Sequence, residues 1–111
     1  MKISEVISKL QLTAYTRMPG GEELINNVYV SDLLSDVMAN AHEKGIWITL
    51  QTHINVVAVA AMKNIPAVII VNGRKPDDDT LKKATDEGVA ILGTDMHAFE
   101  AAGILYNMLN G

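Results

Sequence analysis

Polar side chains follow four apolar segments of this 111-residue chain, and their types suit the binding of a small polar ligand. Carboxylate, amide, hydroxyl and imidazole groups can hydrogen-bond a ligand, and an arginine can pair with its phosphate. Helix N-termini that begin at such positions offer unpaired N–H groups to an anion. The residues predicted to contact the ligand are Ser31, Asp32, Gln51, Thr52, His53, Asn55, Asn72, Gly73, Arg74 and Thr94.

The same residue types have a second interpretation, because Ser, Thr, Asp and Asn are the preferred N-caps of helices. Capping alone would account for Ser31 and Thr94 without any ligand. It does not account for the group formed by Gln51, His53, Asn72 and Arg74, so the ligand-binding and capping interpretations both stand.

Catalysis and metal binding have weaker support in the sequence. His53 and His97 could bind a metal with Asp32 or Asp95 as a third ligand, but no HExxH spacing occurs. A Ser31, His53 and Asp95 triad lacks the G-x-S-x-G elbow. No GxxxxGK[ST] or GxGxxG motif occurs, so we expect no nucleotide cofactor and no phosphoryl transfer. An enzyme that uses His53 or His97 as an acid or base therefore ranks last.

The elements that position these residues alternate between strands and helices. The segments predicted as strands are 11–15, 28–30, 46–50, 67–71 and 89–92. The segments predicted as helices are 3–10, a segment capped by Ser31 and ended by Gly45, one from Thr52 or His53 to Lys63, 76–88, and one from Thr94 or Asp95 to Leu109. This alternation predicts a single-domain α/β fold with a mostly parallel sheet. Because the carboxyl ends of parallel strands share one edge, the predicted site residues would line one rim.

Composition sets further limits. Hydrophobic residues make up 49% of the chain and charged residues 20%, which is typical of a folded domain. The net charge of −4 argues against nucleic-acid binding, and the absence of Cys excludes disulfides. Lys63 and Pro66 interrupt the most apolar stretch, 54–71, so no membrane span is expected. The amino terminus has no apolar signal region, which predicts a cytoplasmic protein. The region most like a loop is 16–27.

The last predicted helix is apolar over a wider arc than one buried face requires. Its apolar residues are Ala98, Phe99, Ala101, Ala102, Ile104, Leu105, Tyr106, Met108 and Leu109. Such an arc predicts a homodimer or docking onto a neighbouring domain, unless the helix lies in the centre of the fold.

Three segments resemble the DRTGG domain family: 30–39 (VSDLLSDVMA), 47–60 (WITLQTHINVVAVA) and 69–76 (IIVNGRKP). The resemblance extends from about Leu24 to Tyr106, so the chain is read as one DRTGG-like domain over 1–111. The literal DRTGG string is absent, since 23–28 (ELINNV) holds no glycine pair and Gly20–Gly21 lies earlier.

The resemblance implies an α/β fold with a mainly parallel sheet and a regulatory, ligand-sensing or dimer-forming role. The family is similar to the N-terminal domain of HPr kinase/phosphorylase, but this chain lacks a phosphate loop and is not expected to be an HPr kinase by itself. The family segments carry six of the predicted ligand contacts: Ser31, Asp32, Gln51, Thr52, His53 and Asn55. The leading hypothesis is a homodimeric regulatory domain that binds a small anionic or nucleotide-like ligand. The alternative is an interaction module without a ligand.

Overall fold

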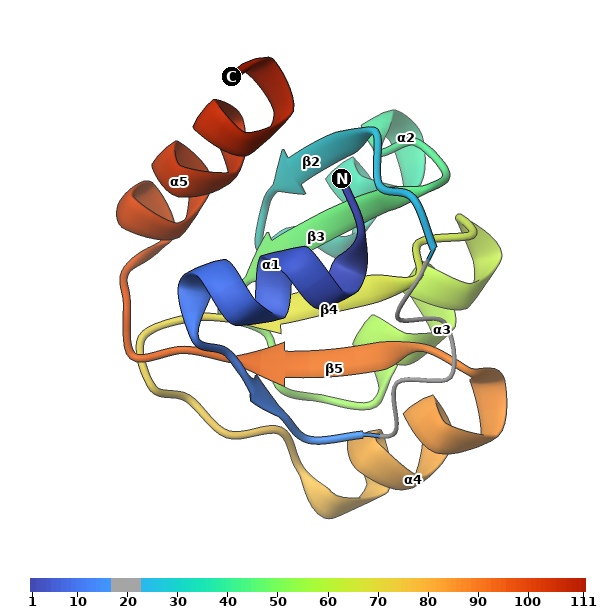
Figure 1. Ribbon diagram of the computed structural model, residues 1–111. Coiled ribbons are helices and arrows are strands. Elements are labelled where there is room, and N and C mark those ends of the chain that lie inside the picture. Colours follow the sequence, from blue (N-terminus) through green and yellow to red (C-terminus); the bar gives the residue numbers. More distant parts are fainter. Residues whose placement is uncertain (17–22) are drawn as a thin grey trace.

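A five-stranded sheet lies between two layers of helices in the structure, a computed structural model that describes residues 1–16 and 23–111 (Figure 1). Of the predicted loop at 16–27, residues 17–22 with Pro19, Gly20 and Gly21 lie outside the described residues. The elements, in chain order, are α1 (Ile3–Leu10), β1 (Thr13–Ala14), β2 (Asn27–Val30), α2 (Leu34–Asn40), β3 (Gly45–Thr49), α3 (Asn55–Met62), β4 (Ala67–Ile70), α4 (Asp78–Glu87), β5 (Ala90–Gly93) and α5 (Ala98–Asn110).

The strands lie in the order β1-β5-β4-β3-β2. Strands β2 to β5 are parallel, and only the short edge strand β1 runs antiparallel, against β5. Tyr29, Trp47, Val68 and Ile91 form one row across the parallel strands. The predicted fold class, α/β with a mostly parallel sheet, is therefore confirmed.

Helices cover both faces of the sheet, which explains why its central strands are apolar without alternation. Every residue of β3, β4 and β5 is buried. The α1 and α5 helices pack on one face, over Ile48 and Ile69, whereas α2, α3 and α4 pack on the other, over Trp47 and Val68. The connections between β2, β3, β4 and β5 all pass over the second face, and the chain after β5 crosses to the first (Figure 1).

The α2 and α5 helices begin at other residues than the sequence predicted. The N-cap position of α2 is Leu33, and that of α5 is His97. The Ser31 hydroxyl accepts a hydrogen bond from Leu33 N at 3.2 Å, and the Thr94 hydroxyl accepts one from Met96 N at 3.1 Å. The capping prediction is therefore wrong for Ser31 and Thr94, because each hydroxyl closes a turn two residues along the chain instead.

The α3 helix also begins later than predicted, with Ile54 rather than Thr52 or His53 at its N-cap position. Thr52 is buried, and its carbonyl oxygen accepts hydrogen bonds from Asp77 N at 3.1 Å and from the Thr80 hydroxyl at 2.8 Å. Thr52, three residues after the end of β3, therefore holds the start of α4 in place.

Gly45 is the first residue of β3 rather than the residue that ends α2. The α2 helix stops at Asn40, and Lys44 supplies the left-handed turn at φ 60°. A Cβ on Gly45 would collide with the side chain of Asn27, the residue paired with it in β2. The glycine is needed for this close approach, because the Asn27 amide reaches past it to donate to Glu43 O at 2.9 Å.

A hydrogen-bonded group fastens α2 to the edge strand β2. The Tyr29 hydroxyl lies 2.9 Å from both carboxylate oxygens of Asp36, and the Asn40 amide donates to Asp36 Oδ1 at 2.9 Å. Hydrogen bonds from Ser31, Asn40 and Tyr29 hold the pKa of Asp36 below its ordinary value. The bond to Asp36 raises the pKa of Tyr29. The link is therefore fully formed near neutral pH.

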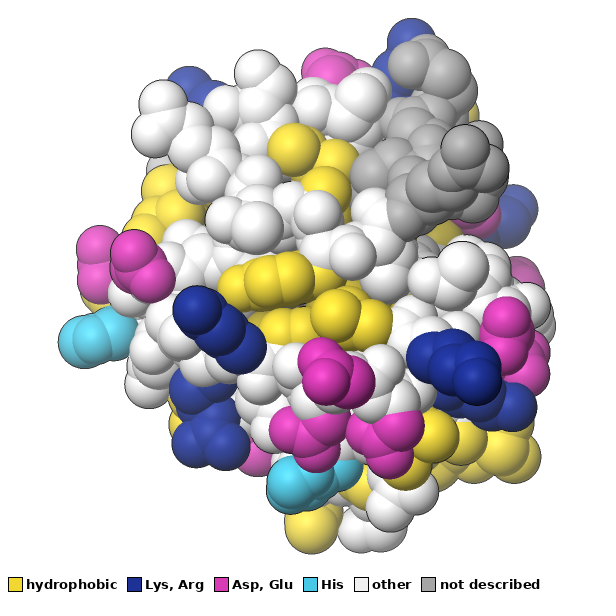
Figure 2. Space-filling view, turned by 90° about the horizontal axis from the view of Figure 1, so that it is seen from below, with side chains coloured by type: hydrophobic (Ala, Val, Ile, Leu, Met, Phe, Trp, Pro, Cys, Tyr) yellow, Lys and Arg dark blue, Asp and Glu magenta, His cyan; other side chains and the backbone are white. Residues whose placement is uncertain are grey.

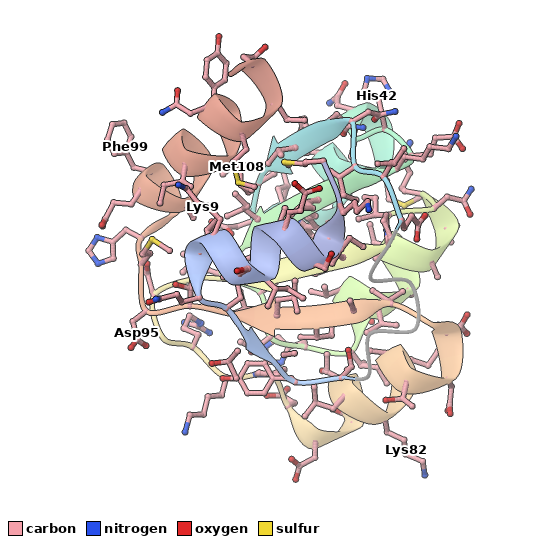
Figure 3. All side chains as sticks on the ribbon, viewed as in Figure 1. Lys9, His42, Lys82, Asp95, Phe99 and Met108 are labelled. Carbon is pink, nitrogen blue, oxygen red and sulfur yellow. The ribbon has the colours of Figure 1, made fainter. Side chains whose placement is uncertain are left out.

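The α5 helix lies on the outside of the molecule and uses one face to cover β2 and β3 (Figure 1). Ala101 and Leu105 are buried, whereas Phe99 is 89% exposed and Tyr106 67% exposed. Phe99 points away from the sheet, while Met108 lies on the side of α5 that faces α1 (Figure 3). The alternative that this helix lies in the centre of the fold is therefore wrong. No helix within 1–16 and 23–111 is both long and apolar enough to cross a membrane.

Candidate functional site

The chain segments that follow β4 and β5 are joined by backbone hydrogen bonds beyond the ends of the strands. Asn72 N donates to Met96 O, and Gly73 N donates to Thr94 O, both at 2.9 Å. Asn72 and Gly73 are both left-handed, with φ of 62° and 66°, and turn the chain away from the sheet. We call the segments that follow β4 and β5 the crossing segments. The segment after β4 continues to α4 on one face of the sheet, and the segment after β5 continues to α5 on the opposite face (Figure 1). Ligands of open α/β sheets bind where neighbouring connections diverge in this way.

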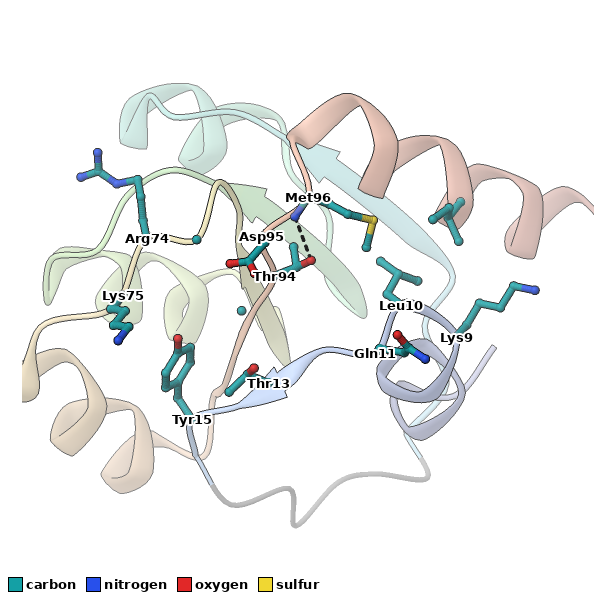
Figure 4. A pocket seen from close by; sticks show the side chains of 13 residues that line it. Lys9, Leu10, Gln11, Thr13, Tyr15, Arg74, Lys75, Thr94, Asp95 and Met96 are labelled. Carbon is teal, nitrogen blue, oxygen red and sulfur yellow. Dashed lines mark hydrogen bonds between the residues drawn. The ribbon is translucent and has the colours of Figure 1, made fainter.

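A groove of about 600 Å³ lies at this point, between the crossing segments and the end of α1 (Figure 4). We call it the cationic groove. Its lining residues are Lys9, Leu10, Gln11, Thr13, Tyr15, Gly73, Arg74, Lys75, Gly93, Thr94, Asp95, Met96 and Ile104.

Three cations and one carboxylate line the cationic groove, so positive charge is in excess there although the whole chain is acidic. Arg74 and Lys75 come from the segment after β4, and Lys9 comes from the last turn of α1 (Figure 4). None of the three forms a salt bridge with any residue in the described part of the chain. Asp95 is exposed and lies against the Cα of Gly73, where a Cβ would be 2.9 Å from its Oδ1.

Tyr15 closes one side of the cationic groove and points into it from beyond β1 (Figure 4). Its backbone N donates to Ile91 O at 2.9 Å, which holds it beside β5. The ring lies directly on Gly93, where an added Cβ would be 2.5 Å from Tyr15 Cε2. Gly93 therefore leaves the space that the ring occupies, and the groove gains an aromatic wall with a hydroxyl.

A second cavity of about 260 Å³ lies at the carboxyl ends of β2, β3 and β4, beneath the start of α5. We call it the apolar cavity. Its lining residues are Val30, Asp32, Ile48, Thr49, Leu50, Val71, Asn72, His97 and Ala98. The crossing segments separate the two spaces, since Asn72 and His97 line this cavity while Gly73 and Met96 line the cationic groove.

Five of the predicted ligand contacts are divided between these two spaces. Gly73, Arg74 and Thr94 line the cationic groove, and Asp32 and Asn72 line the apolar cavity. The parallel strands therefore bring half of the predicted ligand contacts to one edge of the sheet.

The other five predicted contacts are Ser31, Gln51, Thr52, His53 and Asn55, and they line neither space. Gln51 Nε2 donates to Asp32 O at 2.7 Å, so its amide holds the loop after β2. His53 Nδ1 lies 2.8 Å from Asp77 Oδ2. Figure 2 shows a histidine beside a group of carboxylates on the side of the molecule where α4 lies. Asn55 is exposed in the first turn of α3.

Among the lining residues of the cationic groove that were not predicted from the sequence, five come from the start of the chain: Lys9, Leu10, Gln11, Thr13 and Tyr15. They lie before the first parallel strand, and β1 brings them to β5 by running antiparallel. A two-residue strand carries no sequence pattern that sets its partner or direction. Lys9, a basic residue in the last turn of an amphipathic helix, was the one of these residues that the sequence could have suggested as a ligand contact.

The structure does not bring the residues named for metal binding and nucleophilic catalysis together into one site. No group of three His, Asp or Glu suited to a metal occurs in the part of the chain that the structure describes. The histidine of the possible triad, His53, pairs with Asp77, whereas Asp95 lines the cationic groove and Ser31 bonds to Leu33 N.

Fold and site together define a small α/β domain with a charged groove at the carboxyl edge of its sheet. The same fold occurs in a crystal structure of the CBS and DRTGG domains of the regulatory region of Clostridium perfringens pyrophosphatase, complexed with its activator diadenosine tetraphosphate. The TM-score is 0.72 at 14% sequence identity, and the match covers 94% of this chain and 45% of that one. This chain therefore spans less than half of that structure's length.

The likeness confirms the fold that the resemblance to DRTGG domains implied. No protein-family model matches the sequence, and no curated protein matches it.

Proposed function

We propose that this chain is a regulatory domain that binds a small anionic, phosphate-bearing ligand in the cationic groove. One observation carries the proposal: Lys9, Arg74 and Lys75 line one groove at the carboxyl edge of the sheet with no salt bridge to any described residue. The single carboxylate that lines the groove in the described part of the chain, Asp95, does not balance these three cations, and a bound phosphate would supply the missing negative charge. The related fold supports a regulatory role, because it belongs to a regulatory region that binds a nucleotide activator.

The polar groups of the groove suit a phosphate. Arg74 would form a bidentate pair with two phosphate oxygens, and Lys75 would act as a point charge beside it. The Thr94 and Tyr15 hydroxyls can donate further hydrogen bonds. Asp95 disfavours a ligand that lies against Gly73, so we place the phosphate on the Arg74 and Lys75 side.

The proposal predicts that inorganic pyrophosphate binds and that Arg74→Ala weakens the binding by at least about tenfold, because the charge-assisted contact of Arg74 with the phosphate is lost. Isothermal titration calorimetry at low salt measures both affinities. Lys82→Ala is the matched control, because Lys82 is an exposed cation on α4, outside the groove (Figure 3). Absence of heat with pyrophosphate, or equal losses in both variants, would refute the proposal.

The exposed face of α5 favours a second role, the formation of a homodimer, which could also exist without a ligand. Phe99 and Tyr106 lie seven positions apart, two turns along the same side of the helix, and both are exposed. Exposed aromatic residues of this kind are typical of contact surfaces.

If α5 forms the dimer contact, sedimentation at micromolar concentration will show a dimer for the unmodified chain. Phe99→Ser combined with Tyr106→Ser will then sediment as a monomer. Met62→Ser removes a side chain that is 69% exposed on α3 and should leave the dimer intact. A monomeric unmodified chain would remove this second role and leave ligand binding untouched.

A further inference from the structure

We propose that the apolar cavity is a second subsite, which takes the base of a nucleoside phosphate whose phosphate lies in the cationic groove. This inference rests on the function proposed for the groove and adds the class of its ligand. Among the described residues, no Lys or Arg lines the apolar cavity, so it suits a different chemical group from the one that the groove binds.

The two spaces lie on either side of one wall, so a ligand that reaches over this wall can occupy both. Along the chain after β4, Val71 and Asn72 line the apolar cavity and the next three residues line the groove. Along the chain after β5, Met96 lines the groove and His97 the cavity. Because backbone hydrogen bonds tie these two segments together, the wall is a fixed partition with one space on each side.

The lining of the apolar cavity suits a flat ring. Its apolar surface comes from β2, β3, the residues directly after β3 and β4, and the first turn of α5: Val30, Ile48, Leu50, Val71 and Ala98. Its volume of about 260 Å³ lies just below the range of roughly 300–1,000 Å³ that holds a whole drug-sized ligand. The cavity therefore fits one ring system and leaves the sugar and phosphate outside.

Asp32 supplies a specific contact at the mouth of the apolar cavity. Its Oδ1 accepts hydrogen bonds from Leu50 N at 2.7 Å and from the Thr49 hydroxyl at 3.0 Å, which fix the carboxylate. Its Oδ2 receives no hydrogen bond from residues 1–16 or 23–111. A carboxylate oxygen only accepts, so the ring must bring an N–H donor, as the amino group of adenine does. A ring with such a donor, joined to a phosphate, is a nucleotide.

The test compares adenosine 5′-monophosphate (AMP) with ribose 5-phosphate, which has the same phosphate and sugar but no base. We expect AMP to bind the unmodified chain at least about tenfold more tightly, because burial of a ring contributes at that level. Ala98→Leu fills the cavity and should bring the AMP affinity down to that of ribose 5-phosphate, without changing the latter. Ala58→Leu, at an exposed position of α3, adds the same atoms outside both spaces and should change neither affinity.

A second comparison tests the role of Asp32. Purine riboside 5′-monophosphate lacks the amino group of AMP, and we expect it to bind about tenfold more weakly than AMP, the effect of one hydrogen bond to a charged group.

Equal affinities for AMP and ribose 5-phosphate in the unmodified chain would overturn the second subsite, and this result does not depend on whether Ala98→Leu folds. The groove proposal would survive it as long as pyrophosphate still bound. If neither pyrophosphate nor the sugar phosphates bound, the groove proposal would fail, and the second subsite would fail with it.

Discussion

Trp47→Ala is expected to lower the free energy of unfolding by about 3–5 kcal/mol, the cost typical of removing a large aromatic side chain from a core. Trp47 is fully buried at the centre of the parallel strands, between Tyr29 and Val68. Its Nε1 also donates to Ser31 O at 2.8 Å, so the variant leaves both a cavity and a carbonyl without its donor. Since domains of this size are stable by about 5–15 kcal/mol, the loss is a large part of the total.

Urea unfolding followed by circular dichroism measures this loss, since the variant contains no tryptophan for fluorescence. Trp47→Phe keeps most of the volume and should lose less. Tyr106→Ala removes an exposed aromatic residue and should stay within about 0.5 kcal/mol of the unmodified chain. A loss below about 1 kcal/mol for Trp47→Ala would mean that the row of side chains through Trp47 is not a packed core.

Reversal of two charges in the cationic groove should abolish anion binding. Arg74→Glu combined with Lys75→Glu removes two charge-assisted contacts and leaves their carboxylates beside Asp95. Each lost contact is worth about 1.5–3 kcal/mol, so the affinity for pyrophosphate should fall by at least about 100-fold. Both positions are exposed, and neither forms a salt bridge within the described residues, so the thermal midpoint should change little.

The matched control reverses two neighbouring lysines outside the groove, Lys82→Glu with Lys83→Glu on α4. It changes the net charge by the same amount and breaks one exposed salt bridge, that of Lys83 with Glu87. Salt at physiological strength screens such distant charges, so the affinity should stay close to that of the unmodified chain. If the control lost as much affinity as the groove variant, net charge rather than the groove would govern binding.

The parallel part of the sheet was predictable because its strands leave a clear pattern. Residues 67–71 form a continuous apolar run between Pro66 and Asn72, as expected of a strand that helices cover on both faces. The amphipathic spacing of Ile3, Val6, Ile7 and Leu10 likewise predicted α1, and all of these residues are buried except Ile7, which is partly buried. Helix starts were less predictable, because Ser and Thr hydroxyls close short turns as readily as they cap helices.

The candidate site was only partly predictable. The parallel strands placed Asp32, Asn72 and Arg74 at one edge, as their positions after strands implied. Sequence does not tell which way a loop side chain points, and His53 turns to Asp77, at the N-cap position of α4, instead of to either space. Nor does it pair β1 with β5, which is what brings Tyr15 to the cationic groove.

The central claim, that an anion binds in the cationic groove, is tested most directly by following backbone amide resonances during a titration with inorganic pyrophosphate. The account predicts that the largest shifts fall on residues 9–15, 73–75 and 93–96, the three segments that line the groove. Shifts centred on His53 and Asp77, or no saturable shift anywhere, would contradict it.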